Sequence, residues 1–232
     1  MKIINKKTSI QLIAEAIATK NLENLIVGPG LIMSKDYYFN REVAHAEEIL
    51  FKKDQQNENL INQAKDLIHK ELKNLPKEEK DLYQQDLLQA ILNTNVDVGE
   101  VLELGSWQKA LKLSDNTLNW IYKTGYSFFK EKKYEQAWPI FFILTLLNPM
   151  IYEYWVALGF MQRLLSQAKE SIHSFNMASL LKDDEACPKQ QIMEIYCELK
   201  EWEKASSELS KLEKITGEQP EIRKELEFLR NK

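Results

Sequence analysis

The chain has 232 residues, of which 44% are hydrophobic and 28% are charged, as is typical of a globular protein and not of a disordered one. Its formal net charge of -4 at pH 7 offers no basic face for phosphate contacts, so we expect no nucleic-acid partner. Cys187 and Cys197 are too few for a disulfide framework, and no stretch approaches the roughly 18 apolar residues of a membrane span. Because the N-terminus also lacks the features of a signal peptide, the expected location is the cytoplasm.

Residues 1–85 are expected to form a helical N-terminal extension without an internal repeat. Thr8 and Gln11 fit a capping box that opens a short helix, and another helix is expected from about residue 34 to residue 53. Apolar residues recur at helical spacing from Leu60 to Leu72, which predicts a further helix that ends near residue 75. Pro76 is expected to open the helix that follows.

Residues 86–232 are expected to form a second domain, which is organised by an internal repeat. Gly125 and Gly159 lie 34 residues apart, and two other sets of residues follow the same spacing. The small set is Ala137, Ser171 and Ala205, and the large set is Phe141, Phe175 and Leu209. Small residues let two helices of a pair approach closely, and large residues fill the layer between neighbouring pairs. This period and these residue types are typical of the tetratricopeptide repeat, a pair of antiparallel helices.

The predicted fold is therefore all-α, with three tandem tetratricopeptide-repeat helix pairs and a C-terminal capping helix, preceded by the helical N-terminal region. The repeats are expected at about 118–150, 152–184 and 186–217, and the capping helix at 220–231. In the third unit Met193 replaces the glycine and Gly217 stands where a proline would close the unit. Terminal repeats are often atypical. The alternative is a generic helical bundle, which three units in one register disfavour.

Two connected stretches resemble the class II chaperones of type III secretion systems, which are small tetratricopeptide proteins that guard hydrophobic translocator subunits before export. The stretches are LELGSWQKALKLSDNTLNWIYKTGYSFFKEKKYEQA and ALGFMQRLLSQAKESIHSFNMASLLKDD. The resemblance runs from about Val98 to the C-terminus and implies a bacterial cytoplasmic chaperone that is not an enzyme and holds no cofactor. Family members often dimerise through the helix before the repeats. Residues 88–104 correspond to that helix, so the resemblance implies a homodimer unless the extension replaces or blocks the contact.

The resemblance also implies a peptide-binding groove. In the family, the concave face formed by the first helix of each repeat holds an extended client segment of the form P-x-L-x-x-P, with aromatic pockets on the first repeat. The matching positions here are Tyr122, Tyr126 and Phe129 on the first repeat, Val156, Phe160 and Arg163 on the second, and Asn119 and Lys130 at the edges. The aromatic spacing places all three rings on one helix face. The alternative is that Tyr122 and Tyr126 pack against a neighbouring helix.

Adjacent residues on a helix point in different directions, so Phe128 is expected to face the core and Phe129 the groove.

Other functions were weighed against this hypothesis. A repeat scaffold or regulator in another pathway that binds a C-terminal tail would need basic side chains to clamp a carboxylate, and only Lys130 and Arg163 are candidates. No nucleotide-binding or hydrolase motif supports an enzyme. Three acid-x-x-His pairs have the spacing of di-iron ligands, namely Glu42 with His45, Asp66 with His69, and Glu170 with His173. Because no further carboxylates converge on them, no metal site is expected.

Overall fold

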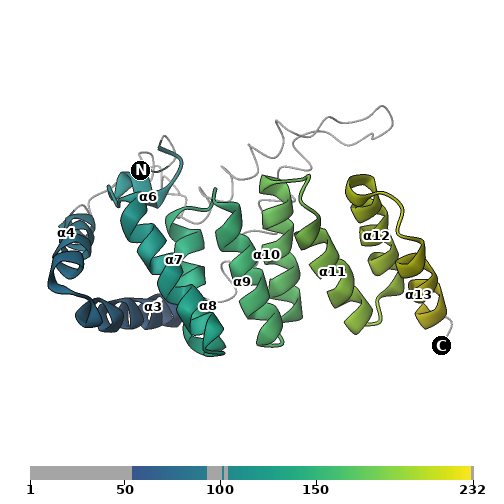
Figure 1. Cartoon of the computed structure of the whole chain (residues 1–232), viewed down its shortest axis with the longest axis horizontal. Helices are drawn as coiled ribbons and strands as arrows, with labels where there is room; N and C mark the ends of the chain where they lie inside the picture. The colour runs from purple at the N-terminus through teal and green to yellow at the C-terminus, as the bar shows by residue number, and fades with distance from the viewer. Residues whose placement is uncertain (1–53, 93–100, 102–103, 231–232) are drawn as a thin grey trace, which may run out of the picture.

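The computed structural model describes residues 54–92, 101 and 104–230, and Figure 1 shows these as a row of helices that follows the order of the sequence. No strand occurs in the described ranges. The row begins with α3 (Asp54–Asn74) and α4 (Lys77–Leu92) and ends with α13 (Pro220–Arg230). The two helices predicted before residue 54, and most of the expected dimer segment 88–104, lie outside the described residues.

Six helices between these ends form three antiparallel pairs. The pairs are α7 (Asp115–Lys130) with α8 (Tyr134–Leu147), α9 (Tyr152–Leu164) with α10 (Ala168–Leu181), and α11 (Ala186–Glu198) with α12 (Trp202–Thr216). The short α6 (Trp107–Ala110) precedes them, and α13 packs against α12. The second helices start at residues 134, 168 and 202, each 34 residues after the last. The predicted all-α fold of tetratricopeptide type is confirmed.

The repeat glycines lie where the two helices of a pair approach closely, as predicted, but the large residues Phe141 and Phe175 contact these glycines within their own pair as well as packing toward the next one. A Cβ atom at Gly125 would lie 2.9 Å from Cγ2 of Ile140, and one at Gly159 would lie 2.8 Å from the ring of Phe175. Both helix pairs are therefore too close for any side chain at these glycines. The three small residues of the second helices are completely buried, as are the three large ones to within 2%: Ala137, Ser171, Ala205, Phe141, Phe175 and Leu209. The hydroxyl of Ser171 donates a hydrogen bond to the carbonyl of Gly159 at 2.8 Å.

The helices before the repeats share a core with the first pair. Ala64, Ile68 and Leu72 on α3 are buried in the same hydrophobic cluster as Ile140 and Leu144 of α8. The predicted helix at 60–75 is confirmed as α3, and the helix predicted after Pro76 is confirmed as α4. The expected boundary between residues 85 and 86 falls within α4, so residues on both sides of it belong to one continuous helix.

Contacts at the start of α7 hold α4 in place. The carboxylate of Asp86 accepts hydrogen bonds from the backbone N–H and the hydroxyl of Ser114, at 2.9 and 2.7 Å. Ser114 is also the N-cap of α7, because its Oγ accepts from the N–H of Thr117 at 3.2 Å. Nearby, the rings of Tyr83 and Trp120 stack at 4.9 Å.

We predict that Asp86→Ala destabilises the fold by about 1 kcal/mol at pH 7, since the carboxylate receives charge-assisted hydrogen bonds. Burial opposes ionisation of Asp86, but the hydrogen bonds from Thr117 and Ser114 outweigh it and lower the pKa of Asp86 below its ordinary value. A lowered pKa stabilises the fold above the pKa of the unfolded chain, near 4, and the gain is lost as the pH falls through the folded value. Urea unfolding at pH 7 and below pH 4 should therefore show the difference between variant and parent shrinking in acid, and a difference that does not change with pH would contradict this role of the charge.

The turn inside each helix pair has the same geometry. Lys132, Ser166 and Lys200, spaced 34 residues apart, have φ angles of 58°, 59° and 60°. In each turn the next residue donates its N–H to the carbonyl five residues earlier, as Gln167 does to Gln162 at 2.8 Å. This is the Schellman motif, which usually places glycine at the left-handed position. Here residues with side chains occupy it, at a cost in conformational energy.

We predict that Ser166→Gly stabilises the fold by about 0.5–1 kcal/mol, because glycine adopts the left-handed conformation without strain. The check is the free energy of unfolding in urea. Ser210→Gly is the matched control, because Ser210 lies within α12 and is exposed, where glycine should destabilise by about 0.5 kcal/mol. Destabilisation by both substitutions would show that the turn is not strained.

Candidate peptide-binding groove

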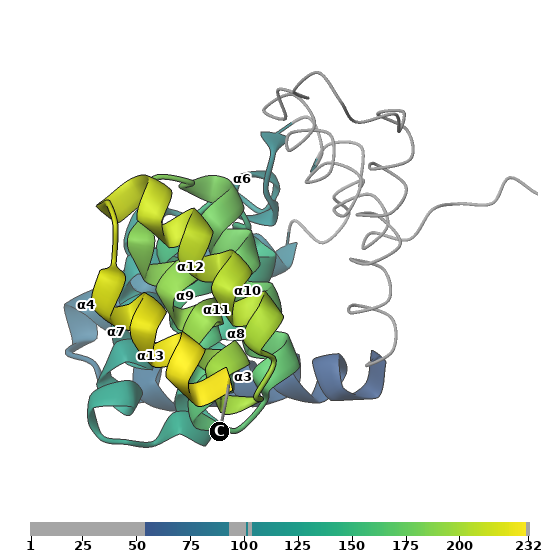
Figure 2. The ribbon, with the colours of Figure 1, turned by 90° about the vertical axis from the view of Figure 1, so that its right-hand side faces the viewer.

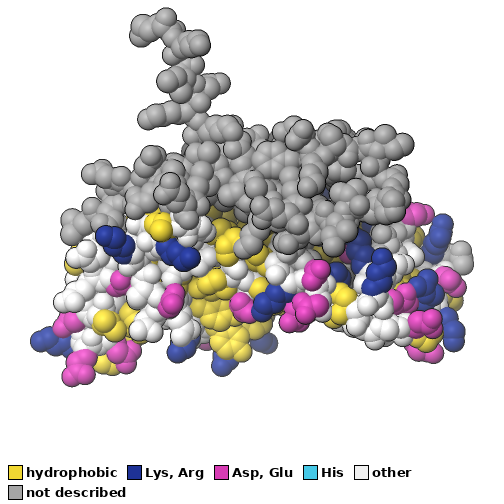
Figure 3. Space-filling view, turned by 90° about the horizontal axis from the view of Figure 1, so that it is seen from above, with side chains coloured by type: hydrophobic (Ala, Val, Ile, Leu, Met, Phe, Trp, Pro, Cys, Tyr) yellow, Lys and Arg dark blue, Asp and Glu magenta, His cyan; other side chains and the backbone are white. Residues whose placement is uncertain are grey.

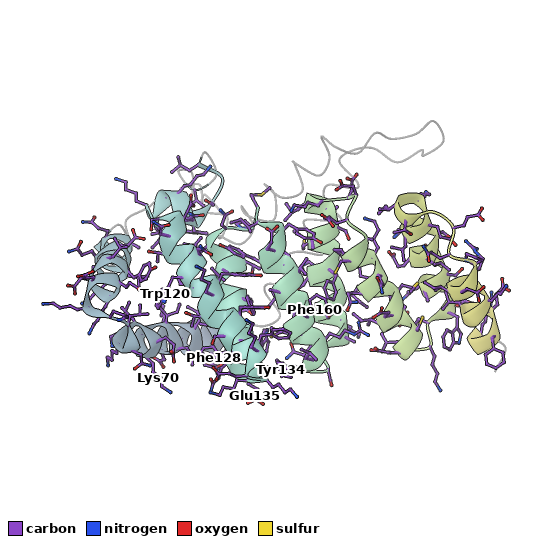
Figure 4. The ribbon with its side chains drawn as sticks, viewed as in Figure 1. Lys70, Trp120, Phe128, Tyr134, Glu135 and Phe160 are labelled. Carbon is purple, nitrogen blue, oxygen red and sulfur yellow. The ribbon has the colours of Figure 1, made fainter. Side chains whose placement is uncertain are left out.

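The eight predicted groove residues all belong to α7 and α9, the first helices of the first two pairs. Figure 2 looks along the stack and shows α7 and α9 on one side, with α8 and α10 on the other. Figure 4 marks Phe128 on α7, Phe160 on α9, and Tyr134 at the start of α8. Phe128 is buried at 7% exposure, as its place in the sequence pattern predicts.

An aromatic cluster lies at the C-terminal end of α7. The ring of Tyr126 stacks on Phe129 at 6.0 Å, and Phe129 lies 6.0 Å from the ring of Tyr134. Tyr126 is 45% exposed, whereas Phe129 and Tyr134 are half-buried. The Nζ atom of Lys130 lies 4.7 Å from the centre of the Tyr126 ring, a cation–π contact. The rings of Tyr126, Phe129 and Tyr134 together form an apolar surface, in which Phe129 packs against the other two and Tyr126 is the most exposed.

Tyr122 has a different environment from Tyr126. Its ring lies 5.6 Å from Phe141, which is in the core, and 5.8 Å from Tyr154 on α9. Burial raises the pKa of Tyr122, and it raises the pKa of Tyr154 to about 12, so both phenols stay neutral at physiological pH. The contacts of Tyr122 are therefore those of a residue that packs against neighbouring helices, and only part of its ring is exposed.

The second repeat contributes fewer aromatic rings to the candidate groove. Phe160 is half-buried and its ring meets Phe175 edge-on at 5.3 Å. Val156 is also half-buried and packs near the same cluster. Asn119 is exposed at the other end of α7. Phe160 therefore has a rigid core contact on one side and an accessible surface on the other.

Arg163 forms a bridge from the second repeat to the third. Its Nη1 donates to Gln191 at 2.5 Å and to Glu194 at 2.7 Å, and its Nη2 donates to Glu198 at 2.5 Å. Burial lowers the pKa of Arg163, but hydrogen bonds from the guanidinium to Glu194 and Glu198 outweigh it and raise the value. We name this set of four residues the Arg163 bridge. Its guanidinium already has two carboxylate partners.

The Arg163 bridge argues against the alternative function, in which basic side chains hold the C-terminal carboxylate of a client. That hypothesis needed Lys130 and Arg163 to hold a client's C-terminal carboxylate. Arg163 is engaged by two glutamates, and Lys130 lies over an aromatic ring. A client carboxylate would have to displace Glu194 or Glu198 against like charge, so the geometry disfavours the clamp.

Along the stack, one column of residues on the first helices changes from aromatic to charged. Position by position, the residues 34 apart are Tyr126, Phe160 and Glu194, so an aromatic surface gives way to a charged one. Figure 3, which looks down on the upper ends of the helices of Figure 1 and so does not show the lower end of α7, has hydrophobic side chains gathered near the middle of the view and many charged ones toward the C-terminal repeats. Among the three repeats, the aromatic positions of this column of the candidate groove therefore lie on the first two.

Sequence reasoning missed the partners of Arg163. The signal was available in the register, because Glu194 and Glu198 lie 31 and 35 residues after Arg163, one repeat away on the facing helix. It also missed the Tyr83–Trp120 stack, because spacing along one helix does not reveal which ring of another helix it meets. Within the part of the chain that the structure describes, no group of three or more His, Cys, Asp or Glu could hold a metal ion. No described helix is long and apolar enough to cross a membrane.

Comparison with known proteins gives matches of fold. No family model matches the chain, and no curated protein matches it. A type III secretion complex from Aeromonas hydrophila is similar at 22% identity, covering 58% of this chain and 87% of that chain, with a TM-score of 0.49. The translocator chaperone SycD of Yersinia enterocolitica has 20% identity, 54% and 94% coverage, and a TM-score of 0.46. PcrH in complex with the chaperone binding region of PopD has 23% identity, 51% and 86% coverage, and a TM-score of 0.44. At these identities the likeness concerns the helical fold alone.

Proposed function

We propose that this protein is a bacterial cytoplasmic chaperone of type III secretion, which binds an extended segment of a hydrophobic translocator in the groove of its first two repeats. The observation that carries the proposal is the aromatic cluster on α7, where Tyr126 is 45% exposed beside Phe129 and Lys130. The client class follows from the resemblance of the two connected stretches to translocator chaperones. Proteins described as such chaperones are also among the solved structures of similar fold.

The chemistry of the cluster suits a proline-containing peptide. Rigid aromatic rings lose little conformational entropy when a ligand covers them, and an extended proline-rich segment loses little as well. The ring of Phe129 cannot move freely because it lies between Tyr126 and Tyr134. The Lys130 ammonium and the Asn119 amide lie on the same helix, and both groups can donate hydrogen bonds to peptide carbonyls.

The test is co-expression of the full chain with the hydrophobic translocators of a type III secretion system from the same organism, followed by affinity capture. The Tyr126→Ala, Phe129→Ala double variant removes the cluster and leaves Tyr122 in its core contacts. Leu180→Ala is the matched control, since Leu180 on α10 is exposed to a similar degree, 46% against 45% for Tyr126. We expect capture by the parent and by Leu180→Ala, and loss of capture by the double variant.

Two outcomes would contradict the proposal in different ways. If the well-folded parent captures no translocator, the proposed function is wrong and the repeats bind another partner. If the double variant captures as well as the parent, with an unchanged thermal unfolding midpoint, the client lies elsewhere on the protein.

A further inference from the structure

The last helix continues the register of the first helices of the repeats. Helices α9, α11 and α13 start at residues 152, 186 and 220, each 34 residues after the last. Leu158, Ile192 and Leu226 follow the same spacing and are buried at 2%, 1% and 7% exposure. The helix α13 therefore continues the register of the first helices, and the register indicates which of its residues share a face with Tyr126 and Phe160.

Phe228 occupies the groove position on α13. It lies 34 residues after Glu194 and 68 after Phe160, which places it in the same column as Tyr126. Its exposure is 62%, against 45% for Tyr126. Single exposed apolar residues are common on protein surfaces, but this phenylalanine lies on a column that begins with two aromatic residues, where it offers a second apolar contact.

The Arg163 bridge separates the two apolar contacts. Glu194 and Glu198 stand between Phe160 and Phe228 along the stack, and the Glu198 side chain is 60% exposed. A partner that covers the whole inner face must therefore present an apolar residue to Phe160, polar residues to the Arg163 bridge, and a second apolar residue to Phe228. A partner with a continuous apolar face would press it against the charged bridge, which is costly. An extended segment meets the requirement, because its residues can differ freely along its length.

We propose that Phe228 is a second anchor for the same client chain, and that the client carries an apolar residue beyond its groove-binding motif, separated from it by a polar spacer. This inference rests on the proposed function. Two repeat steps separate Phe160 from Phe228, and each step spans at least one helix–helix distance of about 10 Å. An extended chain rises about 3.3 Å per residue, so the spacer is at least about six residues long.

The test uses fluorescein-labelled synthetic peptides and the full chain, with affinity read by fluorescence anisotropy. A short probe of about eight residues contains P-x-L-x-x-P in a Ser and Gly background. Two long probes extend it at one end or the other by Ser and Gly residues and one Leu, with spacers of about six to twelve residues. Each probe is titrated with the parent, Phe228→Ala and Leu180→Ala.

We expect one of the long probes to bind the parent about 5–30 times more tightly than the short probe, which is the worth of one exposed aromatic contact. Phe228→Ala should abolish that gain and leave binding of the short probe unchanged, whereas Leu180→Ala should change neither. If the short probe binds but no long probe gains affinity, or if Phe228→Ala weakens short and long probes equally, the second anchor is wrong while the proposed function stands. If no probe binds the parent, the second anchor is wrong, and the co-expression capture described above decides the proposed function separately.

Discussion

Gly159→Ala should destabilise the protein by about 1–3 kcal/mol, although the same change within a helix normally stabilises by about 1 kcal/mol. The added Cβ would lie 2.8–2.9 Å from three carbon atoms of the Phe175 ring. That ring is fully buried and is held edge-on by Phe160, so it has no space to move away. The helices α9 and α10 must separate instead. The measurement is the free energy of unfolding in urea.

The cause can be isolated by a double-mutant cycle with Phe175→Leu, which removes the ring edge from the contact. In that background Gly159→Ala should cost less than in the parent, and the coupling energy should be at least about 0.5 kcal/mol. Gly125→Ala is a milder companion, because its Cβ would come within 3 Å of one atom only, Cγ2 of Ile140 at 2.9 Å, and would lie 3.1–3.2 Å from the Phe141 ring. Stabilisation by Gly159→Ala in the parent would contradict the close approach of the two helices.

Tyr126→Ala should weaken binding of the short P-x-L-x-x-P probe about 10-fold to 100-fold, the effect of removing an aromatic contact from the centre of a binding surface. Because Tyr126 is 45% exposed, its removal leaves no large cavity in the core. The stability of the free protein should therefore change by less than about 0.5 kcal/mol. Anisotropy titration and thermal unfolding of the same preparation give both quantities.

Tyr122→Ala provides the contrast on the same helix. Its ring packs on Phe141 and Tyr154, so this variant should lose both stability and affinity. If Tyr126→Ala lowers stability as much as Tyr122→Ala does, Tyr126 supports the fold and is not a contact for the client.

The repeat fold was predictable because its key residues interact mainly within one pair or with the next pair. The 34-residue register set Gly159 against the small residue Ser171, and the Ser171 hydroxyl does donate a hydrogen bond to the Gly159 carbonyl. The register assigned Phe175 to the layer between pairs, whereas its ring also lies directly against Gly159 within its own pair. The register also predicted that the second helices begin at equal intervals, because helix length and turn length are fixed by the repeat.

Other features could not be predicted from the sequence. The apolar face of α3 shows which side is buried, but not that it packs on α8, because many helix faces would accept Ala64 and Ile68. The left-handed turns carry Lys132, Ser166 and Lys200 in place of glycine, so the usual signal of a helix end was missing. On α7, the sequence placed Tyr122 and Tyr126 on one face, but it could not show that Tyr122 packs against Tyr154 of the next repeat while Tyr126 packs against Phe129.

The buried side chains are unevenly divided along the stack, so some helices should unfold locally more readily than others. Around α7 and α8, one large cluster runs from Ala64 on α3 to Met161 on α9. Beyond it, among the described residues, the C-terminal pairs have only two smaller clusters, around Phe175 and around Leu209. In a repeat protein each unit is stabilised by its neighbours, so local opening free energies follow these clusters. Amide hydrogens in α7 and α8 should exchange most slowly, and protection should decline toward α13, so the chain frays from that end inward.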